Sequence, residues 1–369
     1  MSDPHAVLAG VGSAAALTFV LGGLIAWCGP IDPVKTRSSH TRPTPTSGGL
    51  AVLAGAAAGL ALATALASFA ADDIAPVAAL LALAGGAGFF GAADDLFDLS
   101  PLVKLGALAL LALAVSCGVA HVQALPLGPG LELALGSGLG ALGGALFLIV
   151  LLNTVNFMDG SDGLAVGAAA ISLAGMSAPA FLAGEPAVAT AALAAAAAAA
   201  AFLPWNLRHR AFQGDAGAFF SASMIGGIGL ILASWRITTP YLVVFTVLPL
   251  ITDVLLTLIV RARRRERLLQ AHRDHLYQLW LQSTGRPHLQ LAVRVWGLTA
   301  LTTGVGLLLE LYARDWAFAG LIATTVLLSG AWVRLRARLR AALPRTSAAG
   351  APRAGRPAGA AGTGTPPNR

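Results

Sequence analysis

The chain has 369 residues, of which 56% are hydrophobic and only 11% are charged, with a formal net charge of +7. Apolar runs of about 20 residues recur along it, and a helix of that length crosses the hydrocarbon core of a bilayer. These runs exclude a soluble multidomain protein, because no soluble core could bury so many of them. They also exclude a β-barrel, whose strands alternate between apolar and polar residues.

The apolar runs predict an all-α polytopic membrane protein with about eleven membrane-spanning helices. The first run lacks a basic leader and is longer than the apolar part of a signal peptide, so we expect it to be retained as a helix. The expected spans are residues 6–28, 48–70, 75–92, 101–120, 138–156, 164–183, 187–204, 217–234, 240–260, 289–309 and 316–333.

The basic residues predict the orientation of these spans. With an odd number of spans, alternate loops share one side of the membrane, and of the 24 Lys and Arg residues only Arg236 and Arg314 fall on the less basic side. The positive-inside rule therefore places the N-terminus outside, and the basic loops and the C-terminus in the cytoplasm. Arginines at membrane ends contact anionic lipid, so the net positive charge indicates membrane lipid and no nucleic acid as a partner.

The sequence divides into a membrane domain and a tail. Residues 1–340 form the predicted integral-membrane domain, with its polar loops in the cytoplasm. Residues 341–369 are rich in Pro, Gly and Ala and are expected to be a disordered cytoplasmic tail. Cys28 and Cys117 lie in apolar runs without metal-ligand spacing, and we expect small core residues with no disulfide.

The segment "DDLFD" places three acids at the end of the third span. Asp94 and Asp98 would share a helix face, with Asp95 beside them. Such a group could handle Mg²⁺ and a diphosphate or supply a base, although a solvated helix cap would have the same sequence. Lys104 begins the fourth span, where it could contact phosphate or extend its ammonium group to the membrane surface.

Two further cytoplasmic loops carry acids between glycines. "NTVNFMDGSDGLA", residues 153–165, contains Asp159 and Asp162, and "QGDAG" places Asp215 directly before the eighth span. An aspartate is a good helix N-cap, which would account for Asp215 without any function. The same position also suits a Mg²⁺ ligand, because the helix N-terminus beside it offers N–H groups to phosphate oxygens.

The segment "AHRDHLYQ" carries His272 and His275 within a strongly basic stretch, residues 261–286. One interpretation is a helix that lies on the membrane surface, and another is a grip on an anionic nucleotide sugar. Zinc is disfavoured because no third ligand stands nearby. Asp253 falls inside a span, where an ionisable group is costly, so it is either a site residue or a buried partner of a loop arginine.

Taken in order, these loops resemble the polyprenyl-phosphate N-acetylhexosamine-1-phosphate transferase family over roughly residues 30–290. The similar segments are "RSSHTRPTPTSGG", "DDLFDLSPLVKL", "NTVNFMDGSDGLA", "FQGDAG" and "HRDHLYQ". The first and last of these resemble the O-antigen-initiating branch more than the related phospho-N-acetylmuramoyl-pentapeptide translocase. The chain departs from the family pattern at Gln213, usually Met, at Ala218, usually Ser, and at Thr46, often Arg.

The resemblance implies a bacterial inner-membrane enzyme. It would transfer N-acetylhexosamine 1-phosphate from a UDP-sugar to undecaprenyl phosphate, release UMP, and start a lipid-linked surface glycan such as the O-antigen of lipopolysaccharide or a cell-wall polymer. The implied cofactor is Mg²⁺, with Mn²⁺ as an alternative. The implied partners are undecaprenyl phosphate, a UDP-N-acetylhexosamine and membrane lipid, and a homodimer is left open.

The resemblance also assigns roles to residues. Asp94, Asp95 and Asp215 are the expected catalytic residues, with Asp215 as the Mg²⁺ ligand and Asp94 or Asp95 acting on the lipid phosphate. The residues expected to bind substrate are Lys104, Asn153, Asn156, Asp159, Asp162, His272, Arg273 and His275. The main rival is a secondary transporter of an anionic substrate, which predicts polar residues at mid-membrane and unwound spans.

Overall fold

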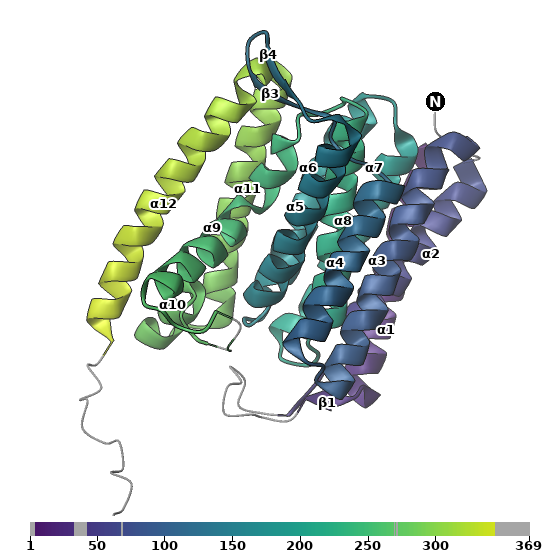
Figure 1. Cartoon of the computed structure of the whole chain (residues 1–369). Coiled ribbons are helices and arrows are strands. Elements are labelled where there is room, and N and C mark those ends of the chain that lie inside the picture. The colour runs from purple at the N-terminus through teal and green to yellow at the C-terminus, as the bar shows by residue number, and fades with distance from the viewer. Residues whose placement is uncertain (1–3, 33–42, 68, 269, 271, 344–369) are drawn as a thin grey trace, which may run out of the picture.

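The computed structural model describes residues 4–32, 43–67, 69–268, 270 and 272–343. Long helices lie side by side in a single bundle (Figure 1). In chain order the helices are α1 (Pro4–Cys28), α2 (Gly49–Ala67), α3 (Ala71–Phe97), α4 (Pro101–Gly118), α5 (Gly136–Met158), α6 (Leu164–Leu182), α7 (Pro186–Leu207), α8 (Gly214–Ser234), α9 (Tyr241–Arg263), α10 (Leu276–Thr284), α11 (His288–Tyr312), the short 3-10 helix η1 (Arg314–Trp316) and α12 (Ala317–Ala342).

The prediction of an all-α membrane protein is confirmed. Eleven helical segments of the described chain are long and apolar enough to cross a membrane, and each corresponds to one predicted span. The structural bounds extend past several predicted ones, as in α3, where the helix continues through polar residues at both ends of its apolar run. The short helix α10 falls within the basic segment 261–286.

Two small antiparallel hairpins accompany the helices. Strand β1 (Ile31–Asp32) pairs with β2 (Thr44–Pro45), and β3 (Ala124–Gly128) pairs with β4 (Leu131–Ala134). The second hairpin was not expected from the sequence. It projects from the end of the bundle at which α1 begins (Figure 1). We call this the hairpin end.

The opposite end of the bundle carries the described parts of the polar loops singled out from the sequence. There α3, α5 and α7 finish, and α4, α6 and α8 begin (Figure 1). We call it the motif end, defined by Asp94, Asp159, Asp215 and His275. Arg236 and Arg314 lie at the hairpin end, where Arg236 pairs with Glu132 at 2.7 Å. The separation of these two arginines from the polar loops agrees with the predicted alternation of loops.

Helix α8 forms the centre of the bundle. It is buried along its length, and it packs against α2, α3, α5 and α6. Its many Gly, Ala and Ser residues let neighbouring backbones approach closely, which is how helices associate within a bilayer. The motif that begins α8 is therefore held at the middle of the motif end.

Two expectations are corrected or lie outside the described chain. Cys28 and Cys117 are free, as predicted, but both are exposed on the bundle surface, so the prediction of core residues is wrong. Each lies in the last turn of an apolar helix, where the exposed face would contact lipid. The tail beyond residue 343 and the loop residues Lys35, Arg37 and Arg42 lie outside the described residues.

Candidate active site

Four carboxylates from three separate helix ends meet at the motif end. Asp94 and Asp95 lie in the last turn of α3, Asp159 follows α5, and Asp215 lies in the first turn of α8. Direct hydrogen bonds and ion pairs connect these segments. We call the four residues the carboxylate centre. The sequence predicted all four as site residues, and the structure brings them together.

Lys104 supplies a positive charge to the carboxylate centre. Its ammonium group pairs with Asp94 and lies 3.1 Å from Oδ2 of Asp215. Asp94 is 4% exposed, so this contact accounts for a buried charge that a solvated helix cap would leave in water. Lys104 thus binds carboxylates in this structure, which excludes the interpretation that it only extends to the membrane surface.

Asp98 does not join the other acids. Helix α3 ends at Phe97, and Asp98 caps it in the left-handed conformation, with φ of 50°. Its backbone N–H donates to the carbonyl oxygen of Asp94 at 2.9 Å, and its side chain is exposed. The expected helix face shared by Asp94 and Asp98 is therefore absent, because the helix stops one residue too early.

Asp215 is oriented by its neighbours and does not act as an N-cap. Its backbone N–H donates to Oδ1 of Asp95 at 3.1 Å, so Asp95 satisfies one of the unpaired donors at the start of α8. The Asp215 side chain instead accepts a hydrogen bond from Nδ2 of Asn156 at 2.7 Å. Together with Lys104, Asn156 fixes the Asp215 carboxylate at the centre of the group.

Two glycines allow α3 and α8 to meet at this point. A Cβ atom on Gly91 would lie 2.4 Å from the backbone carbon and oxygen of Asp215. Gly214 has a φ of +65°, and a Cβ atom there would lie 2.2 Å from Oδ2 of Asp95. A side chain at either position would push the Asp95 carboxylate away from the start of α8.

Gln213 compensates for its departure from the family pattern. The Gln213 side chain is buried, and its amide Nε2 donates to Oδ1 of Asp159 at 2.7 Å. Burial raises the pKa of Asp159 well above its ordinary value. The hydrogen bond from Gln213 opposes this shift, and the charges of Asp215 and Asp95 add to it. The sequence marked Gln213 only as a departure from the family pattern, whereas in the structure its amide contacts the carboxylate centre.

The donor set at this centre suits Mg²⁺. Four carboxylates stand against one lysine, and Oδ2 of Asp95 is buried with no hydrogen-bond partner among the described residues. Within the described chain, no three His, Cys, Asp or Glu side chains form a complete metal-binding group. Mg²⁺ is usually bound by one or two carboxylates together with substrate phosphates, so these carboxylates could hold the ion when a diphosphate is also bound.

The Asp162 carboxylate contacts two histidines and makes no direct contact with the carboxylate centre among the described residues. It is buried, and its Oδ2 lies 2.8 Å from Nδ1 of both His209 and His288. The next residue, Gly163, donates its N–H to Asn206 at 2.5 Å. Asp162 therefore connects the loop after α5 to the segment that follows α7 and to the start of α11. His209, Asn206 and His288 were not singled out from the sequence, because no local pattern links Asn206 and His209 to His288, which lies far along the chain.

Asn153 does not reach the other site residues through a hydrogen bond in this structure. Its Nδ2 donates to the carbonyl oxygen of Ile149 in the same helix at 2.8 Å. Asn156, one turn later, is the residue of α5 that contacts Asp215. The role of Asn153 in binding substrate stays a prediction.

The His272–His275 segment lies against the end of α5. The ring of His275 is 4.8 Å from that of His272, 5.9 Å from Tyr277 and 6.0 Å from Phe157, measured between centroids. The Tyr277 hydroxyl donates to the carbonyl oxygen of Phe157 at 3.1 Å. The histidine segment therefore borders the loop that carries Asp159.

The two histidines are poor cations in this environment. Burial and the positive charge of Arg261 lower the pKa of His272, and burial together with nearby positive groups lowers the pKa of His275 to about 3. Both imidazoles are therefore neutral at neutral pH and would act as hydrogen-bonding groups. Arg273 is exposed at the same loop.

Asp253 anchors this segment from within the bundle. It is buried in α9, and its carboxylate accepts hydrogen bonds from the backbone N–H of Leu276 at 2.8 Å and from Nε1 of Trp332 at 2.9 Å. It thus caps the first turn of α10. Neither alternative from the sequence describes this role, because the partners are a backbone amide and a tryptophan of α12.

Comparisons with known proteins agree with this geometry. Residues 77–233 match the model of the family described as glycosyl transferase family 4. A phospho-N-acetylmuramoyl-pentapeptide-transferase of Mycobacterium sp. (strain JLS) is 32% identical over 321 residues, covering 75% of this chain and 86% of the relative. A decaprenyl-phosphate N-acetylglucosaminephosphotransferase of Mycolicibacterium smegmatis is 28% identical over 285 residues, covering 69% of each. A protein of the same name from Mycobacterium tuberculosis (strain ATCC 25618 / H37Rv) is 28% identical over 304 residues, covering 73% of this chain and 74% of the relative.

Proposed function

We propose the function of this chain from one premise: it belongs to glycosyl transferase family 4, the polyprenyl-phosphate hexosamine-1-phosphate transferases. The family reaction moves a sugar phosphate from a UDP-sugar to a polyprenyl phosphate in the membrane. The observation that carries the proposal is the carboxylate centre itself. Asp94 and Asp215 contact Lys104, Asp95 and Asp159 are bound to the start of α8, and all of them lie at one end of the bundle, where we expect water to meet the bilayer. A membrane-bound acceptor and a soluble donor can meet only at such a boundary.

Phosphoryl transfer depends mainly on positioning and on neutralising charge. An oxygen of the polyprenyl phosphate forms a bond to the β-phosphorus of the UDP-sugar. The bond from that phosphorus to the bridging oxygen breaks, and UMP leaves with the electron pair. Three anionic phosphates approach one another in this step, so the side chains must hold them in line and reduce their repulsion.

The contacts of Asp94 and Asp95 support a choice between them as the residue that acts on the acceptor. Asp94 is occupied by Lys104 and by the backbone N–H of Leu99 at 3.0 Å. Asp95 uses Oδ1 to accept from Asp215, while its Oδ2 has no partner among the described residues. We assign to Asp95 the orientation of the acceptor phosphate and the removal of its proton. Lys104 would contact a phosphate oxygen while it stays paired with Asp94.

Asp215 would hold Mg²⁺ together with oxygens of the diphosphate. When bound, the ion supplies positive charge that stabilises the developing charge on the phosphates. Asn156 and Lys104 keep the Asp215 carboxylate in place. Asn156 and Asp159 would bind the uridine end of the donor, with Asp162 supporting their loop, and His272, Arg273 and His275 would contact the sugar diphosphate.

The specific substrates form the finer part of the proposal. We propose a UDP-N-acetylhexosamine as the donor and undecaprenyl phosphate as the acceptor, with the product starting a lipid-linked surface glycan such as an O-antigen. The names of the relatives specify decaprenyl phosphate and a muramoyl pentapeptide. These are therefore the alternative acceptor and the alternative donor that an assay must compare with the proposed ones. The His272–His275 segment supports a simple sugar, because it resembles the branch without a peptide substituent.

The orientation in the membrane follows from the substrates and the charges. UDP-sugars are cytoplasmic, so the motif end would face the cytoplasm, with the N-terminus outside and the C-terminus inside, across the bacterial inner membrane. The described basic loops at the motif end support this orientation.

A secondary transporter would need a different arrangement. It predicts broken helices and polar groups at mid-membrane. Each of the eleven described candidate spans is a continuous helix through its apolar window, and the carboxylate centre lies at one end of the bundle. Asp253 lies within a span, but it is satisfied by Leu276 and Trp332. The geometry therefore favours the transferase.

The test is turnover by the purified full-length protein in detergent. The assay contains Mg²⁺, undecaprenyl or decaprenyl phosphate, and a panel of UDP-N-acetylhexosamines that includes UDP-N-acetylglucosamine and UDP-N-acetylmuramoyl pentapeptide, and it follows UMP release. We expect turnover with one simple N-acetylhexosamine and with undecaprenyl phosphate. Turnover with the pentapeptide substrate alone would refute the finer proposal, and no turnover with any pair would refute the enzyme.

A further inference from the structure

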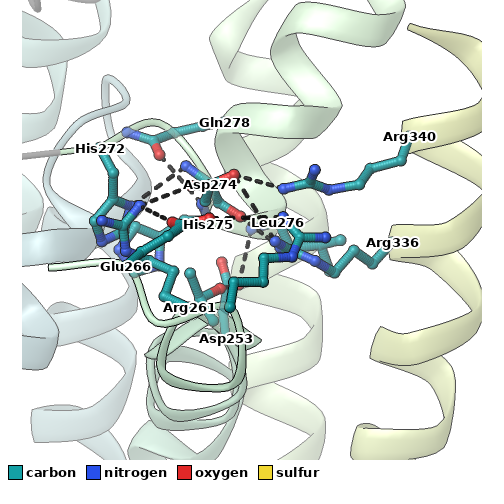
Figure 2. Close-up of polar contacts among 12 residues, drawn as sticks. Asp253, Arg261, Glu266, His272, Asp274, His275, Leu276, Gln278, Arg336 and Arg340 are labelled. Carbon is teal, nitrogen blue, oxygen red and sulfur yellow. Dashed lines mark hydrogen bonds and ion pairs between the residues drawn. The ribbon is translucent and has the colours of Figure 1, made fainter. Parts of the chain in front are cut away.

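Helix α12, the last of the bundle, contacts the histidine segment at Asp274. Oδ2 of Asp274 accepts a hydrogen bond from Nη1 of Arg261 in α9 at 2.9 Å, and Oδ1 accepts from Nη2 of Arg340 in α12 at 2.5 Å. The Asp274 carbonyl oxygen accepts from Nη1 of Arg336 in α12 at 2.5 Å. Figure 2 shows these three arginines converging on Asp274 from two helices. We call Asp274, Arg261, Arg336 and Arg340 the arginine clamp.

The clamp is built into the bundle. Arg261 and Arg336 are each 6% exposed, and a buried guanidinium group is tolerated only when it is paired. Arg336 also lies over the ring of Trp332, with Cζ 4.9 Å from the centroid. Charges held this tightly resist displacement of the loop, whereas a surface ion pair would hold it weakly.

A second contact holds the residue that follows the histidines. Asp253 accepts from the backbone N–H of Leu276 and from Nε1 of Trp332, one turn before Arg336 on α12. The start of α10 is therefore fixed to both α9 and α12 (Figure 2). His275 lies between the two attachments, at Asp274 and at Leu276.

The start of α10 also contacts the loop that carries Asp159, a member of the carboxylate centre. Tyr277 donates to the carbonyl oxygen of Phe157, and a Cβ atom on Gly160 would lie only 2.2 Å from the Tyr277 hydroxyl. Asp159 stands between Phe157 and Gly160 and is bound to Gln213. A shift of α10 would therefore move either the histidines or the Asp159 loop.

We propose that Asp274, Arg336 and Arg340 are positioning residues of the transferase, through which α12 orients His272 and His275 toward the sugar diphosphate. This inference rests on the proposed function. Arg336 and Arg340 lie beyond residue 233, where the family match ends, so the match does not assign them a role. Apolar residues could fasten a helix equally well, whereas charged residues also set the electrostatic surroundings of the imidazoles.

The first experiment replaces Arg340, which is half-buried and can be changed with less risk to folding than Arg336. Arg340→Met should raise the KM for the UDP-sugar about tenfold, because misplaced histidines bind the donor poorly, and should leave the KM for the polyprenyl phosphate unchanged. Arg340→Lys keeps the positive charge and should therefore have a KM for the UDP-sugar close to that of the wild type. Arg338→Met, on the exposed face of the same helix, is the matched control and should behave like the wild type.

A donor KM for Arg340→Met within about twofold of the wild type would overturn the proposal. Equal changes in both KM values would also overturn it, since they would indicate general destabilisation of the bundle.

The second experiment uses the pH dependence of kcat/KM, which a purely structural role would not move in this pattern. The charged and titratable groups that face His272 are Arg261, Glu266, Asp274, His275 and Arg336. Asp274→Asn removes a negative charge and should shift the limb due to His272 to lower pH. Arg336→Gln removes a positive charge and should shift it to higher pH. Shifts in the same direction, or no shift in either variant, would contradict the proposal.

Limited trypsin digestion tests the clamp without any turnover. In the full-length protein in detergent, Arg340→Met should be cleaved within the 264–273 loop about tenfold faster than the wild type and Arg338→Met. If the wild type shows no UMP release, the proposed function fails while this measurement still tests the clamp. If the wild type is active and Arg340→Met keeps the wild-type KM and cleavage rate, the proposal about the arginine clamp is refuted and the proposed function stands.

Discussion

Replacing Gly91 by alanine should reduce transfer without removing any polar group from the site. The new Cβ atom would lie 2.4 Å from the backbone of Asp215, and ordinary van der Waals contact begins at 3.4 Å. The start of α8 must therefore move away from α3 by about 1 Å, since backbone atoms cannot rotate aside. A displacement of about 1 Å can lower a rate on the order of 100-fold. That factor corresponds to about 2.7 kcal/mol of transition-state free energy.

The assay for this prediction is kcat/KM from UMP release by the purified variant, with monodispersity in detergent as a check on folding. Gly86→Ala is the matched control, because it lies in the same helix and its Cβ atom would meet nothing within 4 Å. We expect wild-type activity from that control. If a folded Gly91→Ala protein kept kcat/KM within about threefold of the wild type, the contact between Asp95 and Asp215 would not set the rate, and this reasoning would be refuted.

Three further predictions concern charges at the motif end. Asp215→Asn should lower kcat by about 10²–10³ at saturating donor, because the amide is a weak ligand for Mg²⁺, and unchanged UMP release would contradict its assignment. Lys104→Met should lower kcat/KM by roughly 10²-fold and Lys104→Arg by less, since Lys104 neutralises Asp94 and Asp215, and equal losses in both variants would argue against charge as the cause. Lowering the pH from 7.5 to 5.5 should reduce the free energy of unfolding of the wild type by about 1.4 kcal/mol more than that of His275→Gln. The sign follows because the unfolded histidine takes up a proton below its ordinary pKa of 6.5, whereas His275 in the fold, with a pKa of about 3, does not. An equal loss in the wild type and the variant would exclude His275.

The membrane spans could be predicted from the sequence because their signal is local. Each apolar run of about 20 residues predicts a membrane helix by itself, without information about the rest of the chain. The β3–β4 hairpin carries no such signal. Pro126, Gly128 and Gly130 interrupt its short leucine-containing strands, so the stretch reads as a loop. Its pairing depends on contacts across the turn that composition does not reveal.

The candidate site was predictable where residues stand in recognisable loops. Asp95, Asp159 and Asp215 are separated from their neighbours by glycines or lie at the end of an apolar run, and both patterns are visible in a single sequence. The sequence could not show that Lys104 pairs with Asp215, because the two residues lie 111 positions apart. The pairing is a property of how α3, α4 and α8 cross.

Residues that act through packing were missed for the same reason. Gln213 was read as a departure from a motif, and only the structure shows its amide on Asp159. Arg336 and Arg340 looked like anchors at a membrane end, where arginines are common. Their contacts with Asp274 span 62 and 66 residues of sequence, and no local pattern distinguishes them from Arg334 and Arg338 on the exposed face of the same helix.

The central claim is that this chain transfers a sugar together with its phosphate. The most direct test supplies the purified protein with polyprenyl phosphate, Mg²⁺ and the UDP-N-acetylhexosamine that it uses, radiolabelled at either the α- or the β-phosphorus. The account predicts that the β-label enters the lipid fraction and that the α-label is released as UMP. Recovery of both labels as water-soluble UDP, with the sugar alone on the lipid, would contradict it.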